Sequence, residues 1–383
     1  MNYRLLVLAL ATFGIGTDSY VVAGILPEVA RSFDVTAAAA GQFVTTYSLS
    51  YAIATPLLAT LTANWSRRRV LVAGLAIFVA GNILTVTQHL FSFALVSRAV
   101  AGAGAAIVTP AAGAAAAAMV KPEQRGRALA LVLAGLSAAT AFGAPIGTLV
   151  ASFGDWRTTI WFVAGIGVVA CGLIWAMLPA LSSAGRLTVL ERLAPLANPG
   201  VRAALLTTFI PMFGIFMVYT YISLLFARAT AGDGSRLAIL LSVWGLGATA
   251  GILFAGRLCD RFGSRRVINV CLFAAACDFA LMPWTGAGYL TALLAMAVWG
   301  MFGWGFVLSQ QHRLVSFSPA LAPVLIALNA SAIYLAVSAS SAFGAVLLRM
   351  VDPRLLPLMA AALIASALIS AERAFGRLAI SGA

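Results

Sequence analysis

Long apolar runs, separated by short loops that hold most of the charges, constrain the fold of this chain more than any other feature. A helix needs about 20 mostly apolar residues to cross the ~30 Å hydrocarbon core of a bilayer. The sequence contains twelve such candidates: residues 5–26, 41–62, 70–88, 91–118, 128–151, 158–178, 203–226, 237–256, 267–284, 289–311, 322–347 and 355–371. Only 9% of the 383 residues are charged, whereas soluble domains have about 25%. We therefore expect an all-α membrane protein with twelve transmembrane helices.

The longest polar interval divides these spans into two equal sets. It covers residues 179–200 and is rich in Ser, Pro, Asn and Gly, a composition typical of linkers. The expected organisation is an N-terminal six-helix bundle (1–178), a cytoplasmic linker (179–200) and a C-terminal six-helix bundle (201–383).

The basic residues predict the orientation of the chain. If both termini lie on the same side, seventeen of the 24 basic residues fall on that side and six on the other, while Arg98 lies within a span. Because cytoplasmic loops carry the excess of Lys and Arg, we expect cytoplasmic N- and C-termini in a bacterial-type inner membrane.

The net charge of +13 does not indicate a nucleic-acid-binding protein. The arginines are dispersed through short loops and do not form a basic face on a soluble domain. The four cysteines have no spacing typical of a metal site or of a disulfide framework. We therefore expect no metal, no cofactor and no nucleic-acid partner.

A loop sequence occurs twice, at residues 59–71 and again at 256–268. Internal duplication is typical of secondary transporters, in which two repeats enclose a site in mid-membrane. The second copy contains Gly256, Asp260, Arg261, Gly263, Arg265 and Arg266. The first copy keeps the basic end as Arg67, Arg68 and Arg69, but has Ala63 and Ser66 where the second has Asp260 and Gly263.

The physical chemistry of the second copy suits a cytoplasmic gate. Gly263 permits a tight turn that a Cβ would obstruct. Asp260 can accept charge-assisted hydrogen bonds from neighbouring arginines or can lie at a helix N-terminus. Such a cluster would hold the helix ends together in one conformation and release them in another. The alternative is that these residues are only the positive charges expected in cytoplasmic loops.

The fifth span contains Gly135, Gly143, Pro145 and Gly147. Small residues let helix backbones approach closely in lipid, and Pro145 removes a backbone donor and bends the helix. Ordinary small-residue packing is the alternative to a functional role.

Two opposite charges are expected at one depth inside the membrane. Asp18 lies about eight residues from the expected outer end of span 1, and Arg98 about seven residues from the outer start of span 4. At ~1.5 Å per residue both lie roughly 10–12 Å below the outer surface. A buried carboxylate holds its proton more weakly beside an arginine than away from it, so separating the pair would drive proton exchange. The alternatives are a static ion pair and an Asp18 that faces the outer vestibule.

Other buried or cavity-lining residues are harder to interpret. Asp278, in span 9, is a second candidate acid, although a structural role is favoured for it. The Gln310–Arg313 run is either a gate or a solvated helix end. Polar and aromatic candidates for the substrate cavity are Tyr20, Tyr47, Tyr219, Tyr221, Trp299, Trp304 and Asn329.

These motifs together resemble the major facilitator superfamily. The second loop copy is similar to its signature loop, and residues 18–30, 40–43, 98–102, 154–157 and 327–331 are similar to its twelve-span drug:proton antiporters, including the arabinose-, purine- and chloramphenicol-efflux relatives. The Gly/Pro pattern of span 5 resembles a motif of the antiporter branches. The resemblance implies two pseudo-symmetric six-helix bundles around a central cavity.

The expected function is secondary active export, by alternating access, of a small organic solute (a drug, a nucleobase or nucleoside, or a sugar-like metabolite) in exchange for protons. A proton-coupled symporter or a uniporter is the alternative. An integral membrane enzyme would need clustered catalytic groups, yet the two histidines, His89 and His312, lie near span ends. A kinked chain in two halves also disfavours a channel. We expect a monomer in lipid, driven by the proton gradient.

The two loop copies lead to a prediction. Asp260→Asn should strongly impair transport because it removes the acidic group of the gate, whereas Ala63→Asp should have little effect. Transport rates of the purified variants in proteoliposomes measure both. The reverse ranking would mean that the duplication records ancestry and not the present gate.

Overall fold

The computed structural model describes residues 3–121, 124–179, 181, 188–318 and 321–381, and these residues are nearly all helical, with no strand among them. The helices are α1 (Tyr3–Ser32), α2 (Ala37–Ala40), α3 (Gln42–Leu61), α4 (Arg67–Thr87), α5 (Phe91–Ala118), α6 (Arg125–Ala138), η2 (Ala139–Gly143), α7 (Ala144–Ser152), α8 (Trp156–Met177), α9 (Val189–Leu193), η3 (Ala194–Ala197), α10 (Pro199–Thr220), α11 (Ile222–Leu225), α12 (Ala227–Thr230), α13 (Gly234–Phe262), α14 (Ser264–Thr285), α15 (Tyr289–Phe317), α16 (Ala322–Leu347), η5 (Pro353–Leu355) and α17 (Leu356–Ser381).

Among the described residues, eleven helical segments are long and apolar enough to cross a membrane. The second expected span forms α3, which has the required length of 20 residues but carries several hydroxyl side chains and is less apolar. It packs along α5 and α16, within the helical assembly. With α3 as the twelfth member, the predicted all-α membrane architecture is confirmed.

Several helices run past the ends of the predicted spans. α1 continues six residues beyond residue 26, and α13 and α15 extend to Phe262 and Phe317. Hydropathy marks only the apolar part of a helix, while backbone hydrogen bonds continue through its polar ends. By contrast α10 stops at Thr220, earlier than expected, and the short helices α11 and α12 follow it.

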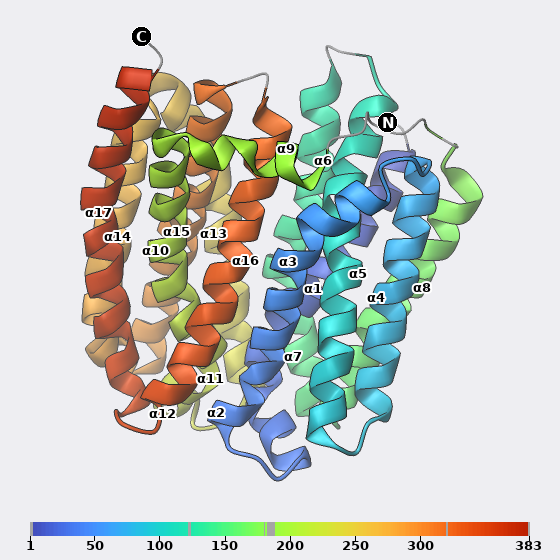
Figure 1. The fold of residues 1–383 in the computed structure, drawn as a ribbon. Coiled ribbons are helices and arrows are strands. Elements are labelled where there is room, and N and C mark those ends of the chain that lie inside the picture. Colours follow the sequence, from blue (N-terminus) through green and yellow to red (C-terminus); the bar gives the residue numbers. More distant parts are fainter. Residues whose placement is uncertain (1–2, 122–123, 180, 182–187, 319–320, 382–383) are drawn as a thin grey trace.

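The spanning helices gather in two groups (Figure 1). One contains α1 and α3–α8, and the other contains α10 and α13–α17; the two groups meet where α3 packs on α16 and where η2 and α7 pack on α13. The predicted boundaries at residues 178 and 200 remain a prediction. Part of the expected linker is helical, because α9 begins with a capping box in which Thr188 and Glu191 bond to each other's backbone N–H.

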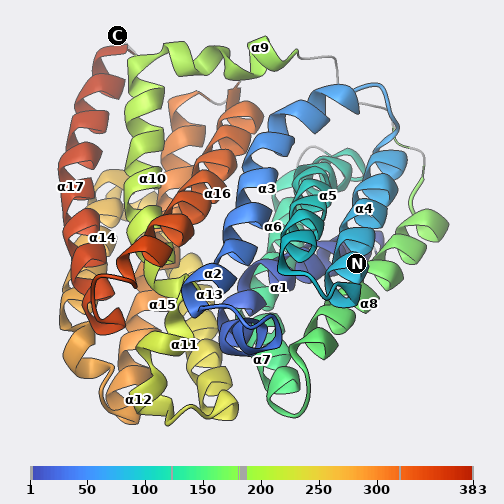
Figure 2. The same ribbon diagram turned by 60° about the horizontal axis from the view of Figure 1, so that its bottom comes forward.

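Both termini lie at one end of the molecule, which we call the arginine-rich end because Arg67–Arg69 and Arg265 also lie there. The opposite, far end is closed. Ser341 Oγ donates to the Gly41 carbonyl oxygen at 2.8 Å, and Ser338 Oγ donates to that of Thr45 at 3.0 Å. Figure 2, which brings this end forward, shows α2 close to α1 and α16. The tyrosine ring of Tyr221 packs so closely on Gly41 that a Cβ there would overlap it.

The glycines of the fifth span face α1. A Cβ on Gly135 would overlap the carbonyl oxygen of Ala9, and one on Gly143 would overlap Thr17 Oγ1. A π-helical turn, Ala139–Gly143, precedes Pro145, so the helix is already irregular before the proline that was expected to bend it. Such turns insert one extra residue into a helix and often mark functional positions.

This packing predicts the effect of a small substitution. Gly135→Ala should destabilise the protein by about 1–3 kcal/mol, because the added methyl group enters a space that α1 already fills. Gly172→Ala is the matched control, since a Cβ at that helical position meets no atom within 4 Å. The apparent melting temperature in detergent should fall for the first variant and not for the second. Equal melting temperatures would contradict the close α1 contact.

Candidate functional site

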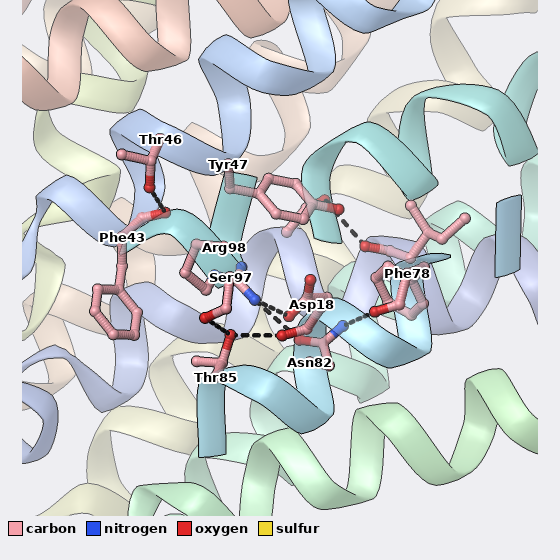
Figure 3. Close-up of polar contacts among 12 residues, drawn as sticks. Asp18, Phe43, Thr46, Tyr47, Phe78, Asn82, Thr85, Ser97 and Arg98 are labelled. Carbon is pink, nitrogen blue, oxygen red and sulfur yellow. Dashed lines mark hydrogen bonds and ion pairs between the residues drawn. The ribbon is translucent and has the colours of Figure 1, made fainter. Parts of the chain in front are cut away.

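Asp18 of α1 and Arg98 of α5 form a buried ion pair. Arg98 Nη1 lies 2.8 Å from Asp18 Oδ1, and the Arg98 and Asp18 side chains are 1% and 0% exposed. The same nitrogen donates to Asn82 Oδ1 at 3.0 Å, so that Arg98 reaches between two acceptors (Figure 3). The guanidinium carbon is also 4.7 Å from the centre of the Tyr47 ring. A dry site thus holds one positive and one negative charge that balance each other.

One oxygen of the acid remains open for chemistry. Asp18 Oδ2 is buried and accepts no hydrogen bond from the described residues. The ion pair with Arg98 therefore engages Oδ1 alone.

The helix α1, which carries Asp18, is longer than the span predicted for it. Since α1 ends at Ser32, Asp18 lies 14 residues from that end and close to the middle of the helix. The depth of Asp18 below the membrane surface remains a prediction, while its contact with Arg98 agrees with the expected pairing. Arg98 does lie seven residues into α5, as expected.

Three tyrosines connect this site to the second group of helices. Ser19 Oγ, beside Asp18 in the sequence, lies 3.3 Å from Tyr47 OH and 3.5 Å from Tyr334 OH of α16. The Tyr334 ring stacks on that of Tyr51, with 3.6 Å between centroids. The sequence analysis missed Tyr51 and Tyr334. The spacing of four between Tyr47 and Tyr51, which places both on one face of a helix, was a signal for the former.

A cavity of about 390 Å³ lies on the other side of α1. Its wall is largely aromatic, and the Tyr20 ring centroid is 5.8–5.9 Å from those of Tyr219, Trp244 and Trp304. We call it the aromatic cavity; its lining residues are Tyr20, Met212, Ile215, Phe216, Tyr219, Trp244, Trp299, Gly303, Trp304, Val307 and Ile333.

Four of the seven residues predicted to line a cavity do so: Tyr20, Tyr219, Trp299 and Trp304. The other three lie elsewhere. Tyr47 contacts Arg98, Tyr221 donates to the Ser341 carbonyl at the far end, and Asn329 accepts a 2.7 Å hydrogen bond from Thr208. The sequence analysis missed Trp244 and Phe216, since a buried aromatic residue in an apolar span has no distinguishing local pattern.

A second cavity, of about 500 Å³, shares Trp304 and Val307 with the first. Its other walls include Leu133 of α6, Ile252 of α13 and Gln311 of α15. Ile252 and Gln311 lie in the halves of α13 and α15 that lead to the arginine-rich end, and Leu133 lies in the corresponding half of the fifth span, Arg125–Ser152. The space between the two groups therefore extends from the aromatic cavity towards that end, while the far end is closed.

Near the arginine-rich end, the structure buries part of the run that was expected to be either a gate or a solvated helix end. Gln310 Nε2 and Arg313 Nη2 both donate to the Ala204 carbonyl of α10, at 2.5 and 3.4 Å. Both side chains are buried. The solvated-end interpretation is wrong for these two residues.

The second loop copy differs from expectation at Asp260. This residue lies in the last turn of α13, at a C-terminal helix end and not at an N-terminus. Among the described residues it forms no salt bridge with an arginine; His312 Nε2 lies 3.6 Å from Asp260 Oδ1, a contact that is an ion pair only when the imidazole is protonated. Arg265 pairs instead with Glu372 of α17. Gly263 has a φ of +80°, as expected for a turn that favours glycine.

The first loop copy contacts the chain that follows α8. The Arg67 backbone N–H donates to the Leu181 carbonyl at 3.1 Å, and Arg68 Nη1 to that of Leu178 at 3.4 Å. The Arg68 guanidinium also lies over the Trp175 ring. This copy has Ala63 where the second copy has Asp260, and its arginines connect α4 to the start of the interval between the two groups.

Asp278 is 8% exposed, and its Oδ2 accepts no hydrogen bond from the described residues. It belongs to α14, which packs on α13, α15 and α17 within the second group. Its place away from the interface between groups agrees with the structural role favoured from the sequence, which remains a prediction.

Comparisons with known proteins agree with this architecture. The chain is 29% identical over 315 residues to the inner membrane transport protein YdhP of Escherichia coli K12, covering 82% of this chain and 81% of YdhP. It is 29% identical over 266 residues to a chloramphenicol resistance protein of Streptomyces lividans, covering 68% of each. The crystal structure of a D-xylose–proton symporter superposes with a TM-score of 0.78 at 16% identity, covering 96% of both chains. The family model of the Major Facilitator Superfamily matches residues 8–345, and the chain therefore belongs to this superfamily of transporters and is not an enzyme.

Proposed function

We propose that this transporter exports a small organic solute across a bacterial-type inner membrane in exchange for protons, by alternating access. The observation that carries the proposal is the sequence Asp18–Ser19–Tyr20 on α1. Asp18 contacts the buried Arg98, Ser19 contacts the Tyr334 hydroxyl of the second group, and Tyr20 lines the aromatic cavity. A change in the protonation of Asp18 would therefore occur one residue from Ser19, which faces the second group of helices, and two residues from Tyr20, which would face the solute.

The orientation follows from the charge distribution. Positively charged loops favour the cytoplasm, so the arginine-rich end is the cytoplasmic one and both termini lie inside. The described conformation, closed at the far end and hollow towards the arginine-rich end, then faces the cytoplasm. A solute would enter from the cytoplasm in this conformation and leave after the far end opens.

Export is favoured over symport by the relatives and by the fifth span. One relative is named for resistance to chloramphenicol, which a transporter can provide by moving the drug out of the cell. In this chain the glycines of α6–α7 pack tightly on α1, which disfavours a leak of protons beside the ion pair. Since the same fold also serves a symporter, the direction of proton flux is the decisive measurement.

Asp18→Asn should abolish proton exchange, because an amide cannot take up the proton that the carboxylate binds. The variant in proteoliposomes should no longer change the lumenal pH when solute is added, while solute counterflow persists. Chloramphenicol serves as the first probe, followed by solutes from an export screen of deletion and overexpressing strains.

Asp278→Asn is the matched control for this measurement, as it neutralises a second buried acid and should leave proton exchange intact. Proton exchange at the normal rate in Asp18→Asn, or its loss only in Asp278→Asn, would contradict the proposed role of Asp18.

Tyr334→Phe should weaken coupling while preserving the fold. The substitution keeps the ring stacked on Tyr51 but removes the hydroxyl beside Ser19, a loss of about 1 kcal/mol and therefore about a fivefold effect. We expect proton-driven net efflux to fall by about that factor while counterflow changes little. Tyr3→Phe, at an exposed position, is the control. An equal fall in both transport modes would show that Tyr334 is only a packing residue.

A further inference from the structure

Trp244 offers an unused hydrogen-bond donor in the wall of the aromatic cavity. Its side chain is 1% exposed, and its Nε1–H is buried without an acceptor among the described residues. The neighbouring Tyr219 differs, since its hydroxyl donates to the Tyr20 carbonyl at 3.0 Å. Buried donors are normally paired, and an unpaired donor on a residue of a cavity wall is suited to an acceptor on a ligand.

The cavity also lacks charge. Among the described residues, no Asp, Glu, Lys or Arg lines either cavity. The nearby Asp18 and Arg98 neutralise each other on the opposite side of α1. A cation entering this space would lose its hydration and find no counter-ion, and the positive end of the Trp244 N–H dipole would repel it.

Aromatic walls can nevertheless bind cations through their π faces. Here the rings pack mainly on one another, and in each edge-to-face pair one of the two rings has a face covered. Tyr20 makes edge-to-face contacts with Tyr219, Trp244 and Trp304, at interplanar angles of 87°, 61° and 73°. Each face covered by a neighbouring edge is closed to a cation. The remaining surface favours flat, apolar groups.

A sugar fits this wall poorly for a different reason. Every hydroxyl buried without a partner costs free energy. The lining supplies few polar groups, and the hydroxyl of Tyr219 is already engaged with a backbone carbonyl. Several sugar hydroxyls would therefore remain unpaired.

We propose that the aromatic cavity selects a neutral, flat, largely apolar solute with at least one hydrogen-bond acceptor, and that Trp244 Nε1–H is the group that recognises this acceptor. This inference rests on the proposed function only in taking the cavity as the solute site.

Equilibrium binding to the purified, full-length protein tests the inference without a proton gradient. The probes are 1-methyl-2-quinolone (neutral, with a carbonyl acceptor), 1-methylquinolinium (a cation of similar shape), 2-methylnaphthalene (no acceptor) and D-xylose. Quenching of tryptophan fluorescence reports binding. We expect the quinolone to bind more tightly than each of the other three.

Two variants identify the donor. Trp244→Phe should weaken quinolone binding about tenfold, the effect of one lost hydrogen bond, and should change methylnaphthalene binding much less. Trp156→Phe is the matched control, because Trp156 also has a buried Nε1 without an acceptor but lies outside the cavity. It should leave binding of both probes unchanged.

Several outcomes would overturn the inference. Tighter binding of the quinolinium would identify a cation site, and tighter binding of D-xylose would identify a sugar site. An equal loss of quinolone and methylnaphthalene binding in Trp244→Phe would assign Trp244 to packing alone. Selective quinolone binding in a protein that moves no protons would contradict the proposed exchange mechanism but not this inference.

Discussion

The bilayer obliges every polar group within it to find a partner inside the protein, and the rest of the structure follows from this constraint. Backbone groups meet it by forming helices. Hydroxyl side chains meet it locally, as when Thr55, Thr207 and Thr220 donate to the carbonyl four residues earlier. Charges cannot be satisfied locally, so Asp18, Arg98 and Asn82 must come together from three different helices.

Helix α1 is the element on which the functional groups converge. Successive residues of a helix point about 100° apart. Asp18 therefore faces Arg98, Ser19 faces Tyr334 of the second group, and Tyr20 faces the aromatic cavity. The same helix is held closely by the glycines of the fifth span. Close packing makes α1 a stiff connection between the ion pair and the aromatic cavity.

The two groups of helices have different chemistry despite the repeated loop. The buried ion pair belongs wholly to the first group, whereas the aromatic cavity is walled mainly by α10, α13 and α15 of the second. The loops differ in the same way, since one retains Asp260 and the other binds the chain after α8 through Arg67 and Arg68. The two groups are both helical scaffolds, and they carry different polar residues.

The sequence by itself determined the helical class and the number of spans, because the length of an apolar run is a local property set by the thickness of the bilayer. It also indicated Asp18 and Arg98, since a charge within an apolar run needs a partner and few candidates exist. Only the tertiary structure decided which aromatic residues share a cavity. Trp244 and Tyr334 have no local signal, and the contacts of Tyr47 with Arg98 and of Tyr221 with the Ser341 carbonyl could not be predicted, because the direction of a side chain matters only once neighbouring helices are positioned. The partner of Asp260 also depended on tertiary structure, because His312 comes from a helix fifty residues away in the sequence.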